Sequence, residues 1–280
     1  MPHVHANGID IEYETFGDST SDPLLLIMGF GRQMIAWPDA FCAALADRGF
    51  HVIRYDNRDV GLTTLTNAPY TIDEMADDAA GLLSALGFTA AHVVGASMGG
   101  AIAQSLAIRR PEMVLSLTSI MSGPGRLDQA GSDPEVLRRI AEPPVADRAA
   151  AIERAVRIAR AVGSPRMFDE ARARDAATRA WERNPSYDGL ERQRRAMAAS
   201  GDRTEALRAI RVPALVIHGE LDPLVSVSAG RRTAAAIPGA RLVTVSGMGH
   251  DLPKPVWPLV IDAIADVAGR ASTTRMHSSA

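Results

Sequence analysis

The sequence predicts an α/β fold with a mostly parallel, eight-stranded sheet and helices on both faces. Short apolar runs alternate along much of the chain with longer stretches of helical spacing, which is the rhythm of a doubly wound sheet. The chain has 280 residues and is 46% hydrophobic, enough for one large core with an insertion or for two small domains. The clearest local signal is Gly95-Ala96-Ser97-Met98-Gly99, where an apolar run passes through a sharp turn into a helical stretch.

Composition argues against several partners and locations. The net charge of −3 and the pI of 6.2 give no basis for binding nucleic acid. No apolar run reaches the roughly 18 residues of a membrane span, and the first residues lack the basic and apolar blocks of a signal peptide. Cys42 is the only cysteine, which fits a reducing compartment, and its surroundings favour a packed residue over a catalytic one. We therefore expect a cytoplasmic protein.

The N-terminal residues predict a β-hairpin. Residues 3–6 and 9–16 alternate apolar with polar side chains, and the intervening Asn7-Gly8 is a preferred two-residue turn. The alternation indicates one buried and one solvated face, so the hairpin should form an antiparallel edge of the sheet.

The parallel part of the sheet is expected to begin at residues 24–28, an unbroken apolar run typical of a strand covered on both faces. Thr71 precedes a predicted helix that has Asp73 and Glu74 in its first turn, where negative charge is favourable, and Gly87 just past its end. The remaining elements expected in this part of the chain are strands at 51–55, 91–94 and 115–121 and helices at 37–48 and after Ser97.

A change of composition after residue 122 predicts a helical cap at 123–211, with the core formed by 1–122 and 212–270. The cap segment carries Ala, Arg and Glu at helical spacing, broken by prolines, and has no clear β run. Strands are expected again at 214–218 and 241–245 and helices at 226–237 and 256–268, and the Ser/Thr-rich tail 271–280 is expected to be disordered.

Ser97 is the candidate nucleophile. Its backbone is expected to be strained at the turn, and the glycines two positions away on either side are needed because a side chain there would collide with the adjoining strand or helix. The strain lifts Oγ clear of the sheet, and the following helix points its first N–H groups at any oxyanion that forms. Since parallel strands end along one rim, where ligands bind in such sheets, Ser97 lies at the expected site.

A serine nucleophile needs a base and an acid, and candidates for both follow later strands. His250 comes in a glycine-flanked loop after residues 241–245, and Asp222 comes just after residues 214–218. His218 is a competing histidine at the same rim, and Glu220 is a competing acid. Along the chain the order is Ser97, Asp222, His250, which is the order found in hydrolases whose nucleophile lies on a sharp turn between a strand and a helix. No group of residues has metal-ligand spacing, and no cofactor is expected.

Five motifs follow one another along the chain: Gly29-Phe30-Gly31, Asp56-Asn57-Arg58-Asp59-Val60-Gly61, the turn around Ser97, His218-Gly219-Glu220-Leu221-Asp222-Pro223 and Gly249-His250. With these motifs the chain resembles the α/β-hydrolases. More narrowly, residues 24–41, 52–61 and 247–250 resemble the aclacinomycin methylesterase group of ester hydrolases. The resemblance covers nearly the whole core and weakens in the cap. It favours Asp222 over Glu220 as the acid, and it implies a structural role for the Asp56–Gly61 segment.

The fold implied by this resemblance predicts an oxyanion hole formed by the main-chain N–H groups of Phe30 and Met98. Many relatives have His-Gly where this chain has Met28-Gly29, a difference that affects the pocket lining and leaves the main-chain donors in place. The expected chemistry is ester hydrolysis through an acyl-enzyme on Ser97.

An apolar or aromatic acyl pocket is expected around Phe30, Met34, Trp37 and Met121. Trp181 and Tyr187 fit pocket lining and core packing equally well. Arginines of the cap favour a solvated helical surface over steering of an anionic substrate.

Other functions remain open at this point. The same three residues could serve lactone opening, carbon–carbon bond hydrolysis, perhydrolysis or acyl transfer, and a ligand receptor on a hydrolase scaffold is an alternative of another class. A small-molecule ester is the expected partner, and a homodimer is also open.

Overall fold

A single eight-stranded sheet forms the centre of the protein. The computed structural model describes residues 2–125 and 131–278. The strands are β1 (His3–Ala6), β2 (Ile9–Phe16), β3 (Asp22–Ile27), β4 (Phe50–Tyr55), β5 (Ala91–Ala96), β6 (Val114–Ile120), β7 (Ala214–Gly219) and β8 (Arg241–Val245). Their order in the sheet is β1-β2-β4-β3-β5-β6-β7-β8, with β1, β2 and β4 paired antiparallel and all later neighbours parallel. The predicted α/β fold with a mostly parallel sheet is confirmed.

The α-helices lie on both faces of the sheet and in the long segment between β6 and β7. They are α1 (Asp39–Ala46), α2 (Ile72–Ala85), α3 (Met98–Arg109), α4 (Pro134–Ala141), α5 (Arg148–Val162), α6 (Glu170–Arg183), α7 (Leu190–Ala199), α8 (Thr204–Leu207), α9 (Val227–Ala236) and α10 (Trp257–Ser278). Helix α2 begins at a capping box, in which the Thr71 hydroxyl accepts from the Asp73 N–H and the Glu74 carboxylate accepts from the Thr71 N–H.

The predicted N-terminal hairpin is confirmed residue for residue. Ala6 pairs with Ile9 across the turn, and Asn7 and Gly8 have φ angles of 50° and 77°. Positive φ at both central positions is what a type I′ turn requires, and Asn and Gly tolerate it best.

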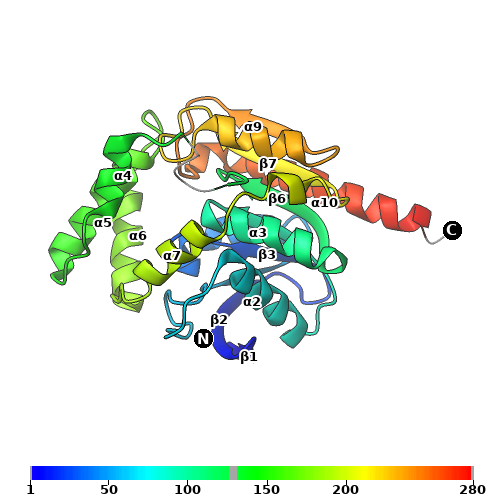
Figure 1. Cartoon of the computed structure of the whole chain (residues 1–280), viewed down its shortest axis with the longest axis horizontal. Coiled ribbons are helices and arrows are strands. Elements are labelled where there is room, and N and C mark those ends of the chain that lie inside the picture. Colours follow the sequence, from blue (N-terminus) through cyan, green and yellow to red (C-terminus); the bar gives the residue numbers. More distant parts are fainter. Residues whose placement is uncertain (1, 126–130, 279–280) are drawn as a thin grey trace.

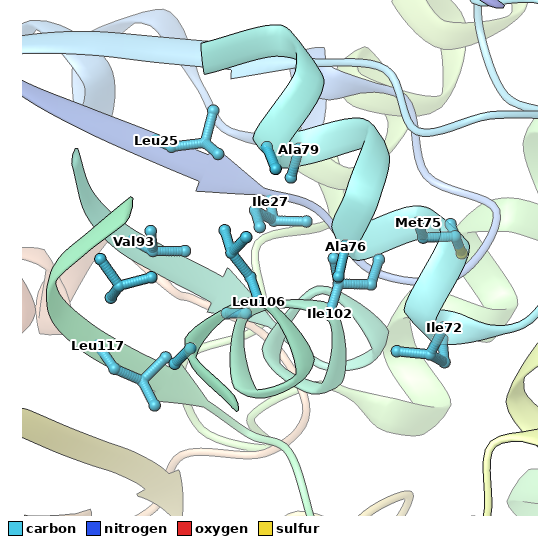
Figure 2. Close-up of a cluster of buried hydrophobic side chains, with 14 of the residues drawn as sticks. Leu25, Ile27, Ile72, Met75, Ala76, Ala79, Val93, Ile102, Leu106 and Leu117 are labelled. Carbon is cyan, nitrogen blue, oxygen red and sulfur yellow. The ribbon is translucent and has the colours of Figure 1, made fainter. Parts of the chain in front are cut away.

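Alternate residues of the buried strands pack into two separate cores, one on each face. Leu25 and Ile27 of β3 face the helices α2 and α3, as Figure 2 shows, where they meet Ile102 and Leu106. Leu24 and Leu26 face the other way, into a core that includes side chains of α1 and α10. Since both faces are covered, the strands read as continuous apolar runs in the sequence.

The segment between β6 and β7 contains only helices among its described residues. Helices α4, α5 and α6 stand together to one side of the sheet, and α7 runs back from them toward the core (Figure 1). Ala196 of α7 and Leu207 of α8 belong to the α2–α3 core, so the end of this helical insertion packs on the sheet domain. Part of the predicted cap, residues 126–130, lies outside the described residues.

The C-terminal tail differs from its prediction. We expected disorder from residue 271, whereas α10 continues to Ser278. The residues from 271 to 278 include neither Gly nor Pro, so no residue there interrupts the helical backbone. Residues 279–280 lie outside the described part of the chain.

Candidate active site

The turn between β5 and α3 holds Ser97 in the strained conformation expected from the sequence. Its φ and ψ are 56° and −120°, a region that residues other than glycine rarely occupy. A Cβ on Gly95 would lie 2.0 Å from the Gly99 carbonyl oxygen, and a Cβ on Gly99 would lie 2.1 Å from the Ile27 carbonyl oxygen. Both glycines are therefore required by space alone, and Ser97 is held at the carboxyl end of the sheet.

The structure brings together the three side chains singled out in the sequence. Nε2 of His250 lies 2.9 Å from Oγ of Ser97, and Nδ1 of His250 lies 2.7 Å from Oδ2 of Asp222. Both are hydrogen-bond distances. One imidazole thus connects the hydroxyl to a buried carboxylate, which is the arrangement a serine needs to transfer its proton.

Asp222 is placed to remain ionised. Burial raises the pKa of its carboxyl, but the charge of the His250 ring and hydrogen bonds from His218, His250 and the Val225 N–H outweigh burial and lower the pKa to about 2. Oδ1 also accepts from the Leu224 N–H at 2.9 Å. A carboxylate held in this way fixes the His250 ring and stabilises it when it becomes protonated.

The two competing residues point elsewhere. The Glu220 carboxylate accepts from the Thr244 hydroxyl at 3.1 Å in an exposed position. His218 is fully buried, with Nε2 at 2.7 Å from the Val225 carbonyl oxygen and 3.5 Å from the Asp222 carboxylate. Neither residue contacts Ser97 through any hydrogen bond between described residues.

Two main-chain N–H groups beside Ser97 are free to bind an oxyanion. Met98 begins α3 directly after Ser97, and Phe30 follows Gly29, where a Cβ would lie 3.6 Å from the Ser97 hydroxyl oxygen. Within the described residues, neither the Phe30 nor the Met98 N–H donates to a protein acceptor. These are the two donors expected from the sequence, and their role as an oxyanion hole stays a prediction.

Helical-insertion residues hold the loop that carries His250. The His250 N–H donates to the Val162 carbonyl oxygen at 2.7 Å, and the Gly249 N–H donates to the Ser164 hydroxyl at 2.9 Å. The Ser164 hydroxyl in turn lies 2.5 Å from Oδ1 of Asp251, which also accepts from the Ser164 N–H. No sequence signal linked Ser164 to this loop.

The insertion also holds the turn that follows β3. The Gly31 N–H donates to the Gln193 side chain at 2.9 Å, and the Gln193 amide donates to the Arg58 carbonyl oxygen. The Gln33 amide donates to the carbonyl oxygens of Ala180 and Asn184. The turn containing Phe30 is therefore fixed from two helices of the insertion.

The segment Asp56–Gly61 contacts both the turn that follows β3 and the helical insertion. The Asp56 carboxylate accepts from the Met34 N–H and from Arg183 of α6, at 2.7 and 2.6 Å. The Asn57 amide donates to the Met28 carbonyl oxygen at 2.8 Å. These contacts support the structural role that the family resemblance implied for this segment.

A cavity of about 460 Å³ lies between the turn after β3 and the helices of the insertion. Of the predicted pocket residues, Phe30 lines it, and so do Trp181 and Tyr187, for which the sequence left pocket and core equally open. Met34, Trp37 and Met121 do not line this cavity.

Trp37 packs in the core and not in this cavity, and a role for it in binding substrate stays a prediction. Its ring stacks on Phe41 with centroids 5.5 Å apart, and Phe41 contacts Trp257, so Trp37 packs in the α1–α10 core. Met34 is fully buried and Met121 is in the same core as Trp37. An aromatic residue near a glycine-rich turn fits both roles in a sequence.

Neither a metal site nor a membrane span is found in the described part of the chain. No group of three or more His, Cys, Asp or Glu residues among the described ones could hold a metal ion. None of the helices formed by these residues has the length and apolar character needed to cross a bilayer.

Comparison with known proteins shows the family to which the chain belongs. Residues 22–253 match the model of the alpha/beta hydrolase fold family. The chain is 33% identical over 277 residues to rhodomycin D methylesterase DauP of Streptomyces sp. (strain C5), covering 90% of this chain and 92% of that protein. It is 25% identical over 253 residues to the bifunctional esterase/perhydrolase DCH of Acinetobacter calcoaceticus, covering 88% of this chain and 91% of that protein.

Solved structures give the same result for the fold. An esterase from Thermogutta terrifontis superposes with a TM-score of 0.73 at 25% identity, covering 97% of this chain and 99% of that one. The enol-lactonase from Burkholderia xenovorans LB400 superposes with a TM-score of 0.77 at 24% identity, covering 95% and 99%, and shows the fold alone. The family match covers most of the chain, the methylesterase relative covers nine-tenths of it, and the resemblance seen in the sequence is confirmed: the chain belongs to the α/β-hydrolase fold family.

Proposed function

We propose that this protein is a serine carboxylic-ester hydrolase that acts through an acyl-enzyme on small to medium apolar or aromatic esters. The observation that carries the proposal is the His250 imidazole, which lies within hydrogen-bond distance of both the Ser97 hydroxyl and the Asp222 carboxylate. The family match and the methylesterase relatives support the assignment to carboxylesterase-type hydrolases.

In the acylation step, Oγ of Ser97 attacks the ester carbonyl carbon while Nε2 of His250 takes the hydroxyl proton. The N–H groups of Phe30 and Met98 bind the negative oxygen of the tetrahedral intermediate. The intermediate collapses by breaking its bond to the alkoxy group, and His250 returns the proton to the departing alcohol. Asp222 stabilises the imidazolium during this step.

In the deacylation step, water replaces the alcohol. His250 takes a proton from the water, the hydroxide attacks the acyl-enzyme carbonyl, and Ser97 leaves as a hydroxyl with the proton from His250. The products are a carboxylic acid and an alcohol, and the protein returns to its starting state.

The substrate class is supported by the cavity beside Phe30. Its volume of about 460 Å³ lies in the range of small-molecule sites, and Phe30, Trp181 and Tyr187 give it aromatic walls. The relatives also include two proteins named rhodomycin D methylesterase, which supports a methyl ester as substrate.

Turnover of a methyl ester by Ser97→Ala tests the proposal. Methyl benzoate and p-nitrophenyl acetate should be hydrolysed by the unaltered protein, and Ser97→Ala should lower kcat by about 10³-fold or more. Turnover retained by a folded Ser97→Ala variant would exclude Ser97 as the nucleophile. Product analysis with and without hydrogen peroxide or an acceptor alcohol separates hydrolysis from perhydrolysis and acyl transfer.

A further inference from the structure

The cavity between the turn after β3 and the helical insertion has a charge pattern that apolar ester binding does not explain. Most of its wall is apolar, and three acidic and three basic residues also line it. They are Asp59, Glu142, Glu191, Arg32, Arg154 and Arg194.

Two of the acids are already neutralised by arginine. The Asp59 carboxylate accepts from Arg192 at 2.9 and 3.0 Å. Glu191 accepts from Arg194 at 3.3 Å and from Arg195 at 3.0 Å. Both acids and Arg194 therefore already have partners of opposite charge.

Arg32 is left without such a pair. Among the described residues its guanidinium has no ion pair and no hydrogen bond, and Glu142 does not approach it within ion-pair distance. Arg32 is exposed to solvent and lines the cavity.

Arg154 adds a second unfilled donor to the same wall. It donates to the main-chain oxygen of Glu142, while its Nε is buried and has no partner among the described residues. Like Arg32, it forms no ion pair with a described carboxylate. An arginine stays charged in a protein, and its planar fork binds a carboxylate through two parallel hydrogen bonds.

Arg32 lies in the same turn as Gly29, the glycine whose Cα faces Ser97. Its N–H donates to the Gly29 carbonyl oxygen at 3.2 Å, which closes a tight turn. A Cβ on Gly29 would lie 3.1 Å from the Cβ of Ser97. Because consecutive Cα atoms are about 3.8 Å apart, Arg32 begins at most about 11 Å from Gly29. Arg32 and Phe30 line the same cavity, so a substrate whose ester lies at Ser97 beside Phe30 could present a second group to Arg32.

We propose that Arg32 is a specificity-determining residue that binds a carboxylate carried by the substrate at a distance from the scissile ester. The substrate class is then a half ester of an aromatic or alicyclic dicarboxylic acid, whose ring packs between Phe30, Trp181 and Tyr187. This inference rests on the proposed function for the identity of the reacting group and extends it to the other end of the substrate.

The test compares esters that differ only in that charge. The monomethyl esters of terephthalic, isophthalic and phthalic acid vary the spacing, and the methyl esters of the corresponding carbamoylbenzoic acids are neutral and nearly isosteric. The ratio of kcat/KM for acid over amide should reach about 10- to 100-fold for at least one spacing, the effect of a charged hydrogen bond.

Variants of Arg32 test whether this residue causes the preference for the acid over the amide. Arg32→Gln should bring the ratio close to one, and Arg32→Lys should retain part of it. Arg231→Gln is the matched control, because it removes one positive charge from an exposed position on α9 outside the cavity wall. It should keep the ratio of the unaltered protein. Melting temperatures verify that all three variants are folded.

The outcomes separate the two proposals. The role of Arg32 is overturned if the protein hydrolyses the neutral esters and prefers the acids at no spacing. It is also overturned if the preference for the acids is unchanged in Arg32→Gln. Both outcomes leave the esterase assignment standing. If no ester is hydrolysed, the proposed function fails. In that case calorimetry can still test the role of Arg32, by measuring the binding of the three diacids and of their monoamides to Ser97→Ala. If no diacid binds more tightly than its monoamide, Arg32 does not bind a substrate carboxylate.

Discussion

The hydroxyl of Ser164 lies 2.5 Å from the carboxylate of Asp251, the residue directly after His250. Ser164 comes from the helical insertion and is fully buried, and it also accepts the Gly249 N–H. The insertion therefore holds the loop of the candidate base on both sides of His250. Because a small displacement of a catalytic group costs much activity, this contact should affect turnover.

We expect Ser164→Ala to lower kcat by about tenfold with little change in KM, since the loop loses two hydrogen bonds and the substrate cavity is untouched. Steady-state kinetics on a methyl ester measure kcat and KM separately. Ser84→Ala, at an exposed position of α2, is the control and should have no effect. A rise in KM at constant kcat would instead place the effect of Ser164 on binding.

Asp222 and Glu220 should differ sharply when each is replaced by its amide. Asp222→Asn removes the charge that holds His250 in place, and a loss in kcat of about 10⁴-fold is expected. Glu220→Gln removes only an exposed contact to Thr244 and should leave kcat within a factor of two. Equal losses in both variants would contradict the assignment of the acid.

The low pKa of Asp222 predicts how stability depends on pH. Its pKa of about 2 lies below the value of about 3.9 expected in the unfolded chain. The carboxylate therefore contributes about 2–3 kcal/mol of stability above about pH 5, which is lost progressively as the pH falls through about 2. Urea unfolding at pH 5 and at pH 3 should show a smaller loss for Asp222→Asn than for the unaltered protein. An identical loss would show that Asp222 does not contribute.

Arg58 and Asp78 form a buried ion pair whose loss should destabilise the fold. Two guanidinium nitrogens of Arg58 lie 2.5 Å from the two carboxylate oxygens of Asp78, and Asn7 also donates to Asp78. Asp78→Ala leaves Arg58 buried without its partner, so the free energy of unfolding should fall by about 3–5 kcal/mol. Asp262→Ala removes the partly exposed pair with Arg48 and should change it by less than about 1 kcal/mol. Chemical denaturation measures both.

Cys42 should be unreactive in the folded protein. It is fully buried on α1, and burial raises the pKa of its thiol to about 12. The thiolate is the reactive form, so iodoacetamide at pH 8 should label Cys42 only after denaturation and should not inhibit ester hydrolysis. Rapid labelling with loss of activity would contradict the burial of this side chain.

The order and spacing of local signals were enough to predict the sheet and the meeting of Ser97, Asp222 and His250. Each of these residues follows a strand end, and the glycines around Ser97 reflect space that the fold denies to any larger residue. Local sequence patterns are therefore sufficient to predict these strand ends and the turn around Ser97.

Contacts between distant segments could not be predicted in the same way. Ser164 and Gln193 lie on or next to helices whose polar side chains resemble a solvated surface, and only the docking of the insertion shows that both are buried. The packing of Trp37 on Phe41, and of Phe41 on Trp257, likewise depends on the contact between α1 and α10. Arg32 gave no signal beyond its position in a glycine-rich turn.

Labelling with a fluorophosphonate followed by peptide mass mapping tests the central claim most directly, because this reagent modifies a serine only when a base has activated it. We expect one adduct, on the peptide that contains Ser97, and no adduct in Ser97→Ala. Labelling in His250→Ala should be slower by orders of magnitude. An unmodified Ser97 in protein that hydrolyses esters, or an adduct on another residue that accounts for the inhibition, would contradict the account.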